Sequence, residues 1–203
     1  MKTLIAVPCY GGIDPYFMKC MLEMDRPENT SFAVIKNTLI YNARNTIAEN
    51  AIRYGFDRVF WLDADILFKP DTMIKLSADM DNGYDFMSGV YFKKTDSPAP
   101  VVYSDIWYKV TDNEATSGAT TVVNLPERVF ECAGAGFGCV MTSVRLLKKL
   151  VERYGAPFTP MMGLGEDLAF CWRAKHNGFD LWCDGRVRCG HIGSYVYTGD
   201  EKK

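Results

Sequence analysis

The chain contains 203 residues, of which 48% are apolar and 24% are charged, and these values are typical of a globular protein with a buried core. Its formal net charge of -2 argues against a strongly basic surface of the kind that attracts nucleic acid or anionic membranes. No segment approaches the roughly 18 consecutive apolar residues of a membrane span, and the apolar run before Pro8 is too short for a signal peptide. From the length we expect a single domain over residues 1–203.

The seven cysteines are an odd number and include no C-x-x-C pair. Reduced thiols in a reducing compartment are the simplest interpretation, so we expect a cytoplasmic protein. The alternative is a zinc site formed by Cys183, Cys189 and His191, but their spacing fits no common structural zinc pattern.

Up to residue 92, strand patterns alternate with helix patterns. Residues 3–8, 31–35, 59–62 and 84–92 are predicted strands, and residues 14–24, 38–54 and 70–80 are predicted helices. Asp14 and Pro15 are favoured at a helix start, and Gly55 is favoured just after a helix end. This alternation is typical of an α/β fold whose parallel strands are joined by right-handed crossovers.

The alternation breaks after residue 92. Residues 101–110 and 120–123 are predicted strands around a polar turn at 113–118, which indicates a small antiparallel excursion around residues 93–126. A glycine-rich strand pair or bulged strand at 129–141 follows, then helices at 143–154 and 165–178 around a loop at 155–165, and short strands at 180–184 and 186–191. We therefore expect an α/β fold with a mostly parallel central sheet flanked by helices.

Two carboxylates, Asp63 and Asp65, follow the apolar strand at 59–62. In open α/β sheets ligands bind beyond the carboxyl ends of the strands, and residues two apart in extended chain point to the same side. The pair could thus offer two hard oxygen ligands to one divalent cation. By itself, the pair is more often an acidic loop start.

Three further features stand at predicted strand ends or helix starts: the turn Tyr10-Gly11-Gly12, the pair Glu166/Asp167 and the pair Gly190-His191. Taken alone, acidic residues in a first helical turn are explained by the helix dipole, and a lone histidine by ordinary polar contacts. The turn at 10–12 matches neither G-x-G-x-x-G nor G-x-x-x-x-G-K-[ST], which argues against a dinucleotide dehydrogenase and a P-loop enzyme.

Taken together, the order and spacing of these features resemble the GT-A glycosyltransferases, particularly the small bacterial and phage-type members near family 2. The resemblance covers nearly the whole chain. The segments that carry it are Ile5-Ala-Val-Pro-Cys-Tyr10, Asn42-Ala-Arg-Asn-Thr-Ile-Ala48, Phe60-Trp-Leu-Asp-Ala-Asp-Ile66, Ser88-Gly-Val-Tyr91, Gly134-Ala-Gly-Phe137, Gly165-Glu-Asp-Leu-Ala-Phe-Cys171 and Gly190-His-Ile-Gly193.

The resemblance implies a GT-A (Rossmann-like) fold and a site with Mn²⁺ or Mg²⁺. Asp65 would bind the metal, Asp63 would contact the donor ribose or reach the metal through water, and His191 would complete the metal site. Asp167, or with less support Glu166, would face the reacting centre. The residues implied to bind the nucleotide-sugar are Pro8, Tyr10, Arg44, Asn45, Asp63, Ala64, Gly89 and Gly136.

The implied activity is transfer of a sugar from a UDP- or GDP-sugar to a hydroxyl of a glycan, lipid or protein acceptor. The strand at 31–35 departs from the family pattern, because Lys36-Asn37 stands where many members carry an acidic residue that holds the base. Stacking on sugars and buried packing remain equal alternatives for four aromatic residues, Tyr103, Trp107, Tyr108 and Phe158.

Alternative functions are a catalytically idle protein that binds sugar nucleotides or glycans, and a nucleotidyltransferase. A nucleotidyltransferase normally needs a glycine-rich, basic loop after the first strand, and this chain has Tyr10-Gly-Gly-Ile-Asp14 there. A phosphatase of the haloacid-dehalogenase type is a weaker alternative, since Ile66-Leu67 follows the aspartate pair.

Overall fold

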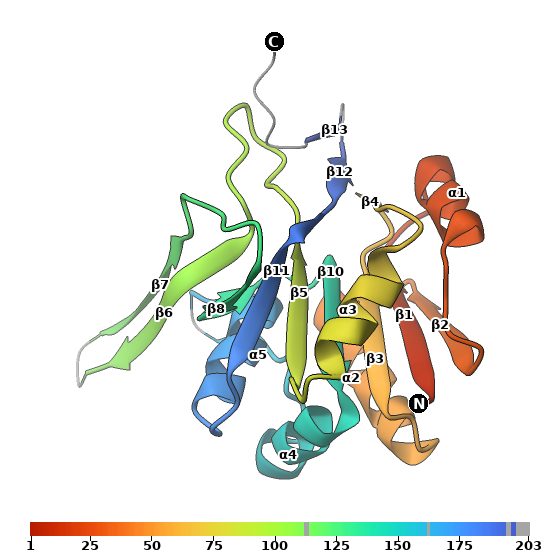
Figure 1. Ribbon diagram of the computed structural model, residues 1–203. Helices are drawn as coiled ribbons and strands as arrows, with labels where there is room; N and C mark the ends of the chain where they lie inside the picture. Colours follow the sequence, from red (N-terminus) through yellow and green to blue (C-terminus); the bar gives the residue numbers. More distant parts are fainter. Residues whose placement is uncertain (112–113, 162, 194–195, 198–203) are drawn as a thin grey trace.

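A seven-stranded sheet forms the centre of the protein (Figure 1). The computed structural model describes residues 1–111, 114–161, 163–193 and 196–197. The strand order is β2-β1-β3-β10-β5-β11-β8, with bounds β1 Thr3–Cys9, β2 Thr30–Lys36, β3 Arg58–Leu62, β5 Phe86–Val90, β8 Val129–Cys132, β10 Cys139–Ser143 and β11 Leu181–Arg188. Strands β1, β2, β3, β5 and β11 run in one direction, and β10 and β8 run in the other. The predicted mixed α/β class with a mostly parallel sheet is confirmed.

Helices cover both faces of the sheet. Their bounds are α1 Pro15–Glu23, α2 Ile40–Arg53, α3 Thr72–Met80, α4 Val144–Tyr154 and α5 Glu166–Lys175. Apolar side chains of α2, α4 and α5 pack in one core cluster, and those of α1 and α3 pack in the other. Strand β3 contributes side chains to both core clusters. Val59 and Trp61 point into the first cluster, and Phe60 and Leu62 point into the second, because successive side chains of a strand face opposite sides of the sheet.

The helix starts follow the capping residues in the sequence. The Asp14 carboxylate accepts a hydrogen bond from the Tyr16 N–H at 2.7 Å, and the Ser143 hydroxyl accepts one from the Leu146 N–H at 3.0 Å. Gly155 ends α4 with φ 70°, a backbone conformation that favours glycine. All five predicted helices are present, although α5 ends at Lys175 rather than at residue 178.

Three predicted strand boundaries were wrong. Strand β11 is continuous over Leu181–Arg188, because β5 and β8 pair with it on either side, and the short β12 Gly190–Ile192 follows it. The glycine-rich segment forms three strands, β8, β9 (Gly134–Ala135) and β10, of which β10 lies between β3 and β5. Strand β7 begins at Ala115, inside the predicted turn at 113–118, of which residue 113 lies outside the described part of the chain.

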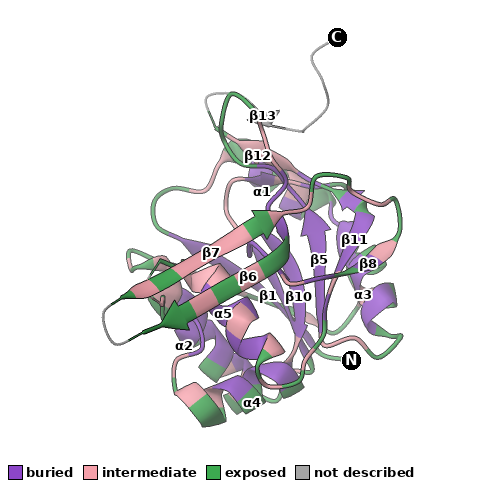
Figure 2. Ribbon diagram, turned by 90° about the vertical axis from the view of Figure 1, so that its left-hand side faces the viewer, coloured by how far each residue is buried: buried purple, intermediate pink, exposed green. Residues whose placement is uncertain are grey.

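The predicted antiparallel excursion is confirmed as a hairpin of β6 Val102–Val110 and β7 Ala115–Thr121, joined by β9 in a small sheet. Figure 2 shows this hairpin lying across the buried strands of the central sheet, with exposed and half-buried residues along most of its length. Trp107 is paired with Gly118, and a Cβ at Gly118 would lie 2.2 Å from the indole ring. Glycine is needed inside this strand because the Trp107 ring covers it.

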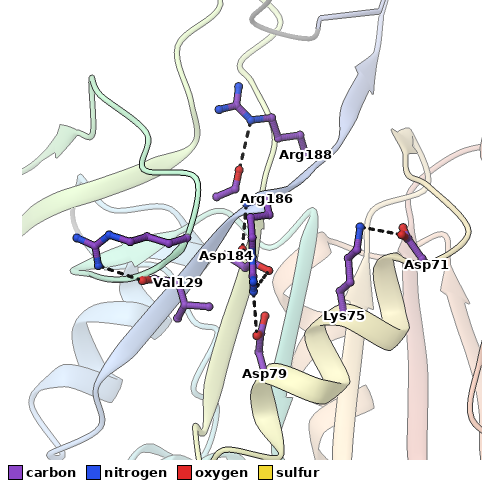
Figure 3. A network of polar contacts seen from close by, with 9 residues as sticks. Asp71, Lys75, Asp79, Val129, Asp184, Arg186 and Arg188 are labelled. Atoms are coloured by element: carbon purple, nitrogen blue, oxygen red, sulfur yellow. Dashed lines mark hydrogen bonds and ion pairs between the residues drawn. The ribbon is translucent and has the colours of Figure 1, made fainter.

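A polar network of the exposed Arg186 with the buried Asp79 and Asp184 ties α3 to β11 (Figure 3). The Arg186 guanidinium donates hydrogen bonds to Asp184 at 2.7 and 2.9 Å and to Asp79 at 3.2 Å. Burial and the neighbouring Asp184 raise the pKa of Asp79 to about 6. Burial opposes the charge of Asp184 as well, but hydrogen bonds from Arg186 outweigh it and lower the pKa of Asp184. The two carboxyls are therefore ionised unequally, since a shared proton relieves the repulsion between them.

The seven cysteines are free thiols, and all of them except Cys20 are buried. Within the described ranges, no three histidine, cysteine or acidic side chains are grouped as metal ligands, so the zinc alternative of Cys183, Cys189 and His191 is not supported. Among the described residues, no helix is both long enough and apolar enough to cross a membrane.

Candidate functional site

The candidate site lies beyond the carboxyl ends of β1, β3, β5 and β11, at the top of Figure 1. Just after β3, the chain forms β4 Ile66–Leu67, which pairs with β12 so that His191 stands opposite Ile66. The Ile192 N–H also donates to the Asp65 carbonyl at 2.7 Å. This strand pairing brings Asp65 and His191 together although they are far apart in sequence.

The His191 ring is held so that one nitrogen faces Asp65. Its Nδ1 lies 2.8 Å from the Phe92 carbonyl oxygen, which can only accept, so Nδ1 carries the hydrogen. In the neutral ring Nε2 is then unprotonated, and it lies 3.5 Å from Asp65 Oδ2. Asp65 Oδ2 and His191 Nε2 thus face each other with their lone pairs, and the two side chains would together hold a divalent cation.

A positively charged side chain reaches the same carboxylate. The Lys94 ammonium forms an ion pair with Asp65 Oδ2. Although burial by itself raises the pKa of Asp65, contacts with protonated His191 and with Lys94 outweigh it and lower this pKa to about 2. Asp65 is therefore ionised across the neutral pH range.

Arg44 joins the other acidic residues of the site. Its buried guanidinium donates to Asp63 Oδ1 at 2.7 Å and to Glu166 Oε1 at 2.5 Å. Burial opposes its charge, but Asp63, Glu166 and Asp167 outweigh burial and raise the pKa of Arg44. The structure places Arg44 as the central cation among three carboxylates, and its predicted contact with the nucleotide-sugar stays a prediction.

Asp167 is half-buried in the first turn of α5, and its Oδ1 accepts a hydrogen bond from the Leu168 N–H at 2.7 Å. Burial and the adjacent Glu166 raise the pKa of Asp167 to about 6, although Arg44 opposes the shift. A carboxyl with this pKa exchanges a proton near neutral pH, which suits a general base or acid.

A pocket of about 350 Å³ opens between the turn after β1 and the aspartate segment. It is lined by Pro8, Cys9, Tyr10, Gly11, Gly12, Asp14, Ile40, Asp63, Ala64, Asp65 and His191. Six predicted site residues are thus brought to one cavity: Pro8, Tyr10, Asp63, Ala64, Asp65 and His191. The Cys9 thiol holds the turn by donating to the Gly11 carbonyl at 3.0 Å.

Four residues predicted to bind the nucleotide-sugar do not line this pocket: Arg44, Asn45, Gly89 and Gly136. The Asn45 side chain is buried and accepts a hydrogen bond from the Phe158 N–H at 2.9 Å. A Cβ at Gly89 would meet the Val187 side chain at 3.0 Å. The structure places these two residues in packing positions, because each is enclosed by other parts of the protein.

Gly136 makes room for Tyr91. A Cβ at Gly136 would lie 2.0 Å from the Tyr91 hydroxyl oxygen, and one at Gly138 would lie 2.9 Å from the same ring. The Tyr91 ring packs edge-on against the His191 ring with centroids 5.3 Å apart. These glycines therefore support the imidazole through Tyr91 instead of lining the pocket.

Of the four aromatic residues whose role was open, Phe158 and Tyr103 are buried packing residues. Phe158 stacks on Phe170 with centroids 4.5 Å apart. Tyr108 packs edge-on against Trp172, whereas the Trp107 side chain is exposed on the hairpin.

Sequence reasoning missed Lys94 and the supporting role of Tyr91. The available signal was their position at the end of a predicted strand, where ligand-binding residues gather in α/β folds. A larger hollow of about 800 Å³, which Arg58, Arg145 and Lys148 help to line, lies at the opposite end of the sheet and includes no predicted site residue.

Asp65 and His191 fit a divalent cation. Mg²⁺ is usually bound by one or two carboxylates together with substrate phosphates, so a site with few protein ligands is sufficient. The predicted third ligand, Asp63, directs Oδ1 to Arg44, and across the described residues no group of three ligating side chains is present. Asp65 and His191 are thus the two predicted metal ligands that the structure brings together, and metal binding by Asp63 stays a prediction.

The architecture is a GT-A-like fold, as comparison with solved structures indicates. The viral protein A197 from STIV superposes with a TM-score of 0.69 at 17% identity, over 100% of this chain and 96% of that one. GalNAc-T7, solved with UDP, GalNAc and Mn²⁺, superposes with a TM-score of 0.63 at 10% identity, over 98% of this chain and 44% of that one. No protein-family model matches the chain, and no curated protein matches its sequence. The assignment to family 2 in particular remains a prediction.

Proposed function

We propose that the protein is a metal-dependent glycosyltransferase that moves a sugar from a nucleotide-diphospho-sugar to an acceptor hydroxyl. The observation that carries the proposal is the convergence of Asp65 Oδ2 and His191 Nε2, 3.5 Å apart, on a pocket at the strand ends of a GT-A-like fold. The presence of UDP, GalNAc and Mn²⁺ in the GalNAc-T7 structure supports this class of donor and a divalent metal.

Asp65 and His191 would hold Mn²⁺ or Mg²⁺, which neutralises the charge that develops on a diphosphate leaving group. Tyr91 and the Phe92 carbonyl fix the orientation of the imidazole, so His191 presents Nε2 without rearrangement. Arg44 holds Asp63 at the pocket wall, where its other carboxylate oxygen remains available to a ribose hydroxyl.

The pocket accommodates the nucleoside part of the donor. Its volume of about 350 Å³ lies within the usual range for small-ligand sites, and Tyr10 at its mouth presents an exposed aromatic ring on which a planar base can stack. Lys36 and Asn37 leave the choice between UDP- and GDP-sugars open, since neither residue is acidic.

Asp167 is the proposed general base. Above about pH 6 its carboxylate can take the proton of the attacking hydroxyl in an inverting reaction. In a retaining reaction Asp167 would instead position the substrate or stabilise positive charge at the reacting carbon.

The test combines binding and turnover. UDP- and GDP-sugars are titrated with and without Mn²⁺, and bound ligand is detected as a rise in the unfolding temperature. Metal-dependent sugar-nucleotide hydrolysis is then measured for the wild type and Asp65→Asn. We expect Asp65→Asn to lose activity by about a hundredfold or more, as when a group stabilising transition-state charge is removed.

The matched control is Asp105→Asn, an exposed position on β6, for which we expect wild-type hydrolysis. Full activity of Asp65→Asn in excess chelator would refute the proposal. Binding of a sugar nucleotide without hydrolysis or transfer would instead assign the idle binding protein.

A further inference from the structure

The loop that follows β5 carries Lys94 to the candidate metal site. Its base is closed by backbone hydrogen bonds from the Lys93 N–H to the Ala99 carbonyl and from the Val101 N–H to the Tyr91 carbonyl, both at 2.9 Å. At the tip, the Thr95 hydroxyl donates to the Ser97 carbonyl at 2.9 Å. The loop is thus held at both ends of its base, and Lys94 extends from it to Asp65.

Lys94 and His191 both face the same oxygen atom, Asp65 Oδ2. The ammonium of Lys94 pairs with Asp65 Oδ2, and His191 Nε2 lies 3.5 Å from that oxygen. A divalent cation shared by Oδ2 and Nε2 would repel the ammonium, because both carry positive charge at the same place. Lys94 and the cation are therefore alternatives at Asp65.

The loop can release Lys94 without disturbing His191. The imidazole is fixed by the Phe92 carbonyl, which belongs to the base of the loop, where Phe92 also pairs with Pro100. Both Lys94 and Asp65 are partly exposed, so the ammonium can turn into solvent or toward a ligand in the pocket. Lysine suits such a change of partner, since its ammonium has three donors on a flexible stem and binds phosphates as a point charge.

We propose that Lys94 is an internal counter-ion that occupies Asp65 before metal binds and then transfers to the diphosphate of the bound nucleotide. This inference rests on the proposed function, because it needs a diphosphate in the pocket. It adds to the metal ion a second cation, Lys94, which was not among the predicted site residues. It also couples the two ligands, since the cation frees the residue that the nucleotide uses.

The test measures binding rather than turnover. Titration calorimetry gives the affinity for Mn²⁺ alone, and then for UDP at saturating Mn²⁺, in the wild type and Lys94→Met. We expect Lys94→Met to bind Mn²⁺ about two- to fivefold more tightly, because a partly exposed ion pair of this strength no longer competes. We expect it to bind UDP weaker by a similar factor of about two to five.

Lys93→Met is the matched control. The Lys93 ammonium lies over the Tyr103 ring, 5.7 Å from its centroid, and does not contact Asp65 in the described structure. We expect both affinities of Lys93→Met to equal those of the wild type. Because Lys94 is partly exposed, replacing it with methionine should leave the unfolding temperature unchanged.

Unchanged or weaker Mn²⁺ binding by Lys94→Met would overturn the inference, and so would unchanged UDP binding. Failure of the proposed function is a separate result. If both affinities shift as expected but the wild type turns over no sugar nucleotide, the counter-ion role stands and the glycosyltransferase does not. If the wild type binds no Mn²⁺, both proposals fail.

Discussion

Arg44 shows why a residue's chemical type is easier to predict than its partners. Its position in Asn42-Ala-Arg-Asn45 marked it as a site residue, and the structure places it at the site. The sequence did not indicate that its guanidinium is buried and bridges Asp63 and Glu166. A buried arginine needs such partners, and they come from distant segments that sequence periodicity cannot connect.

The pKa of Asp167 predicts the pH dependence of activity. Because its base form predominates only above about pH 6, kcat/KM should rise with pH through about 6 and then level off. Asp167→Asn should remove this rise and lower the plateau by about a hundredfold or more. Rates measured from pH 4.5 to pH 8 decide the matter.

Asp79→Asn serves as the control for that profile. Asp79 also has a pKa of about 6, but it belongs to the network of α3 and β11 and not to the pocket. Its replacement should leave the rise at pH 6 intact. If the rise persists in Asp167→Asn, another group is the base.

Gly136→Ala should destabilise the protein by about 1–3 kcal/mol, the usual cost of overpacking a filled core. The added methyl group would meet the Tyr91 hydroxyl at 2.0 Å and force the ring away from His191. Urea unfolding measures the loss. Adding Tyr91→Phe should restore part of it, because this change removes the clashing oxygen.

Gly11→Ala is the control, since nothing lies within 4 Å of a Cβ at this position. Its free energy of unfolding should equal that of the wild type. Equal stability of Gly136→Ala and Gly11→Ala would show that Tyr91 does not need the space.

At the scale of elements, local signals predicted helices better than strands. Asp14 and Ser143 cap the starts of their helices, and Gly155 caps the end of α4, through contacts within a few residues. The local sequence is therefore enough to predict these helix boundaries. Strand β7 was predicted too short because a polar segment containing Gly118 is typical of a turn. The glycine lies within the strand because Trp107 on β6 covers it, and this contact is not local.

The network between α3 and β11 predicts how stability varies with pH. The pKa of Asp79 is raised from 3.8 to about 6 in the folded protein, so the folded state retains a proton that the unfolded chain releases. The free energy of unfolding should therefore fall as pH rises from about 4 to about 6. Asp79→Asn should remove a decline on the order of 1–3 kcal/mol, measured by urea unfolding at each pH.

Asp184 affects the free energy of unfolding in the opposite direction, and it does so at pH values below the range of about 4 to 6 in which Asp79 acts. The pKa of Asp184 is lower in the folded protein than in the unfolded chain, so Asp184 stabilises the folded state at pH values above its unfolded pKa. This contribution is lost as the pH falls through the folded pKa. Asp167, whose pKa is also raised to about 6, likewise makes the free energy of unfolding fall as pH rises. Asp167→Asn should therefore remove only the part of the decline that Asp167 causes. An unchanged decline in Asp79→Asn would contradict the assignment of the proton to Asp79.

For the whole molecule, the fold class was predictable from the sequence and the strand order was not. Alternating patterns predicted parallel strands flanked by helices, and that class is confirmed. Strand β10 lies antiparallel between β3 and β5, although it comes much later in the chain than either. No local pattern shows this insertion, because it depends on which sheet edges remain free after the earlier strands pair.

The candidate site, like the fold, was only partly predictable from the sequence. The sequence placed Asp65 and His191 at strand ends, but only the pairing of β4 with β12 shows that they face each other. Lys94 was not predicted because its position just after a predicted strand does not show that its loop bends toward Asp65.

Because β4 pairs with β12, the two halves of the candidate metal site are synthesised at different times. Asp65 and His191 are 126 positions apart, so at ordinary translation rates roughly 6 to 25 s separate their appearance on the ribosome. During that interval the nascent chain has the carboxylate but no imidazole to share a metal ion with it.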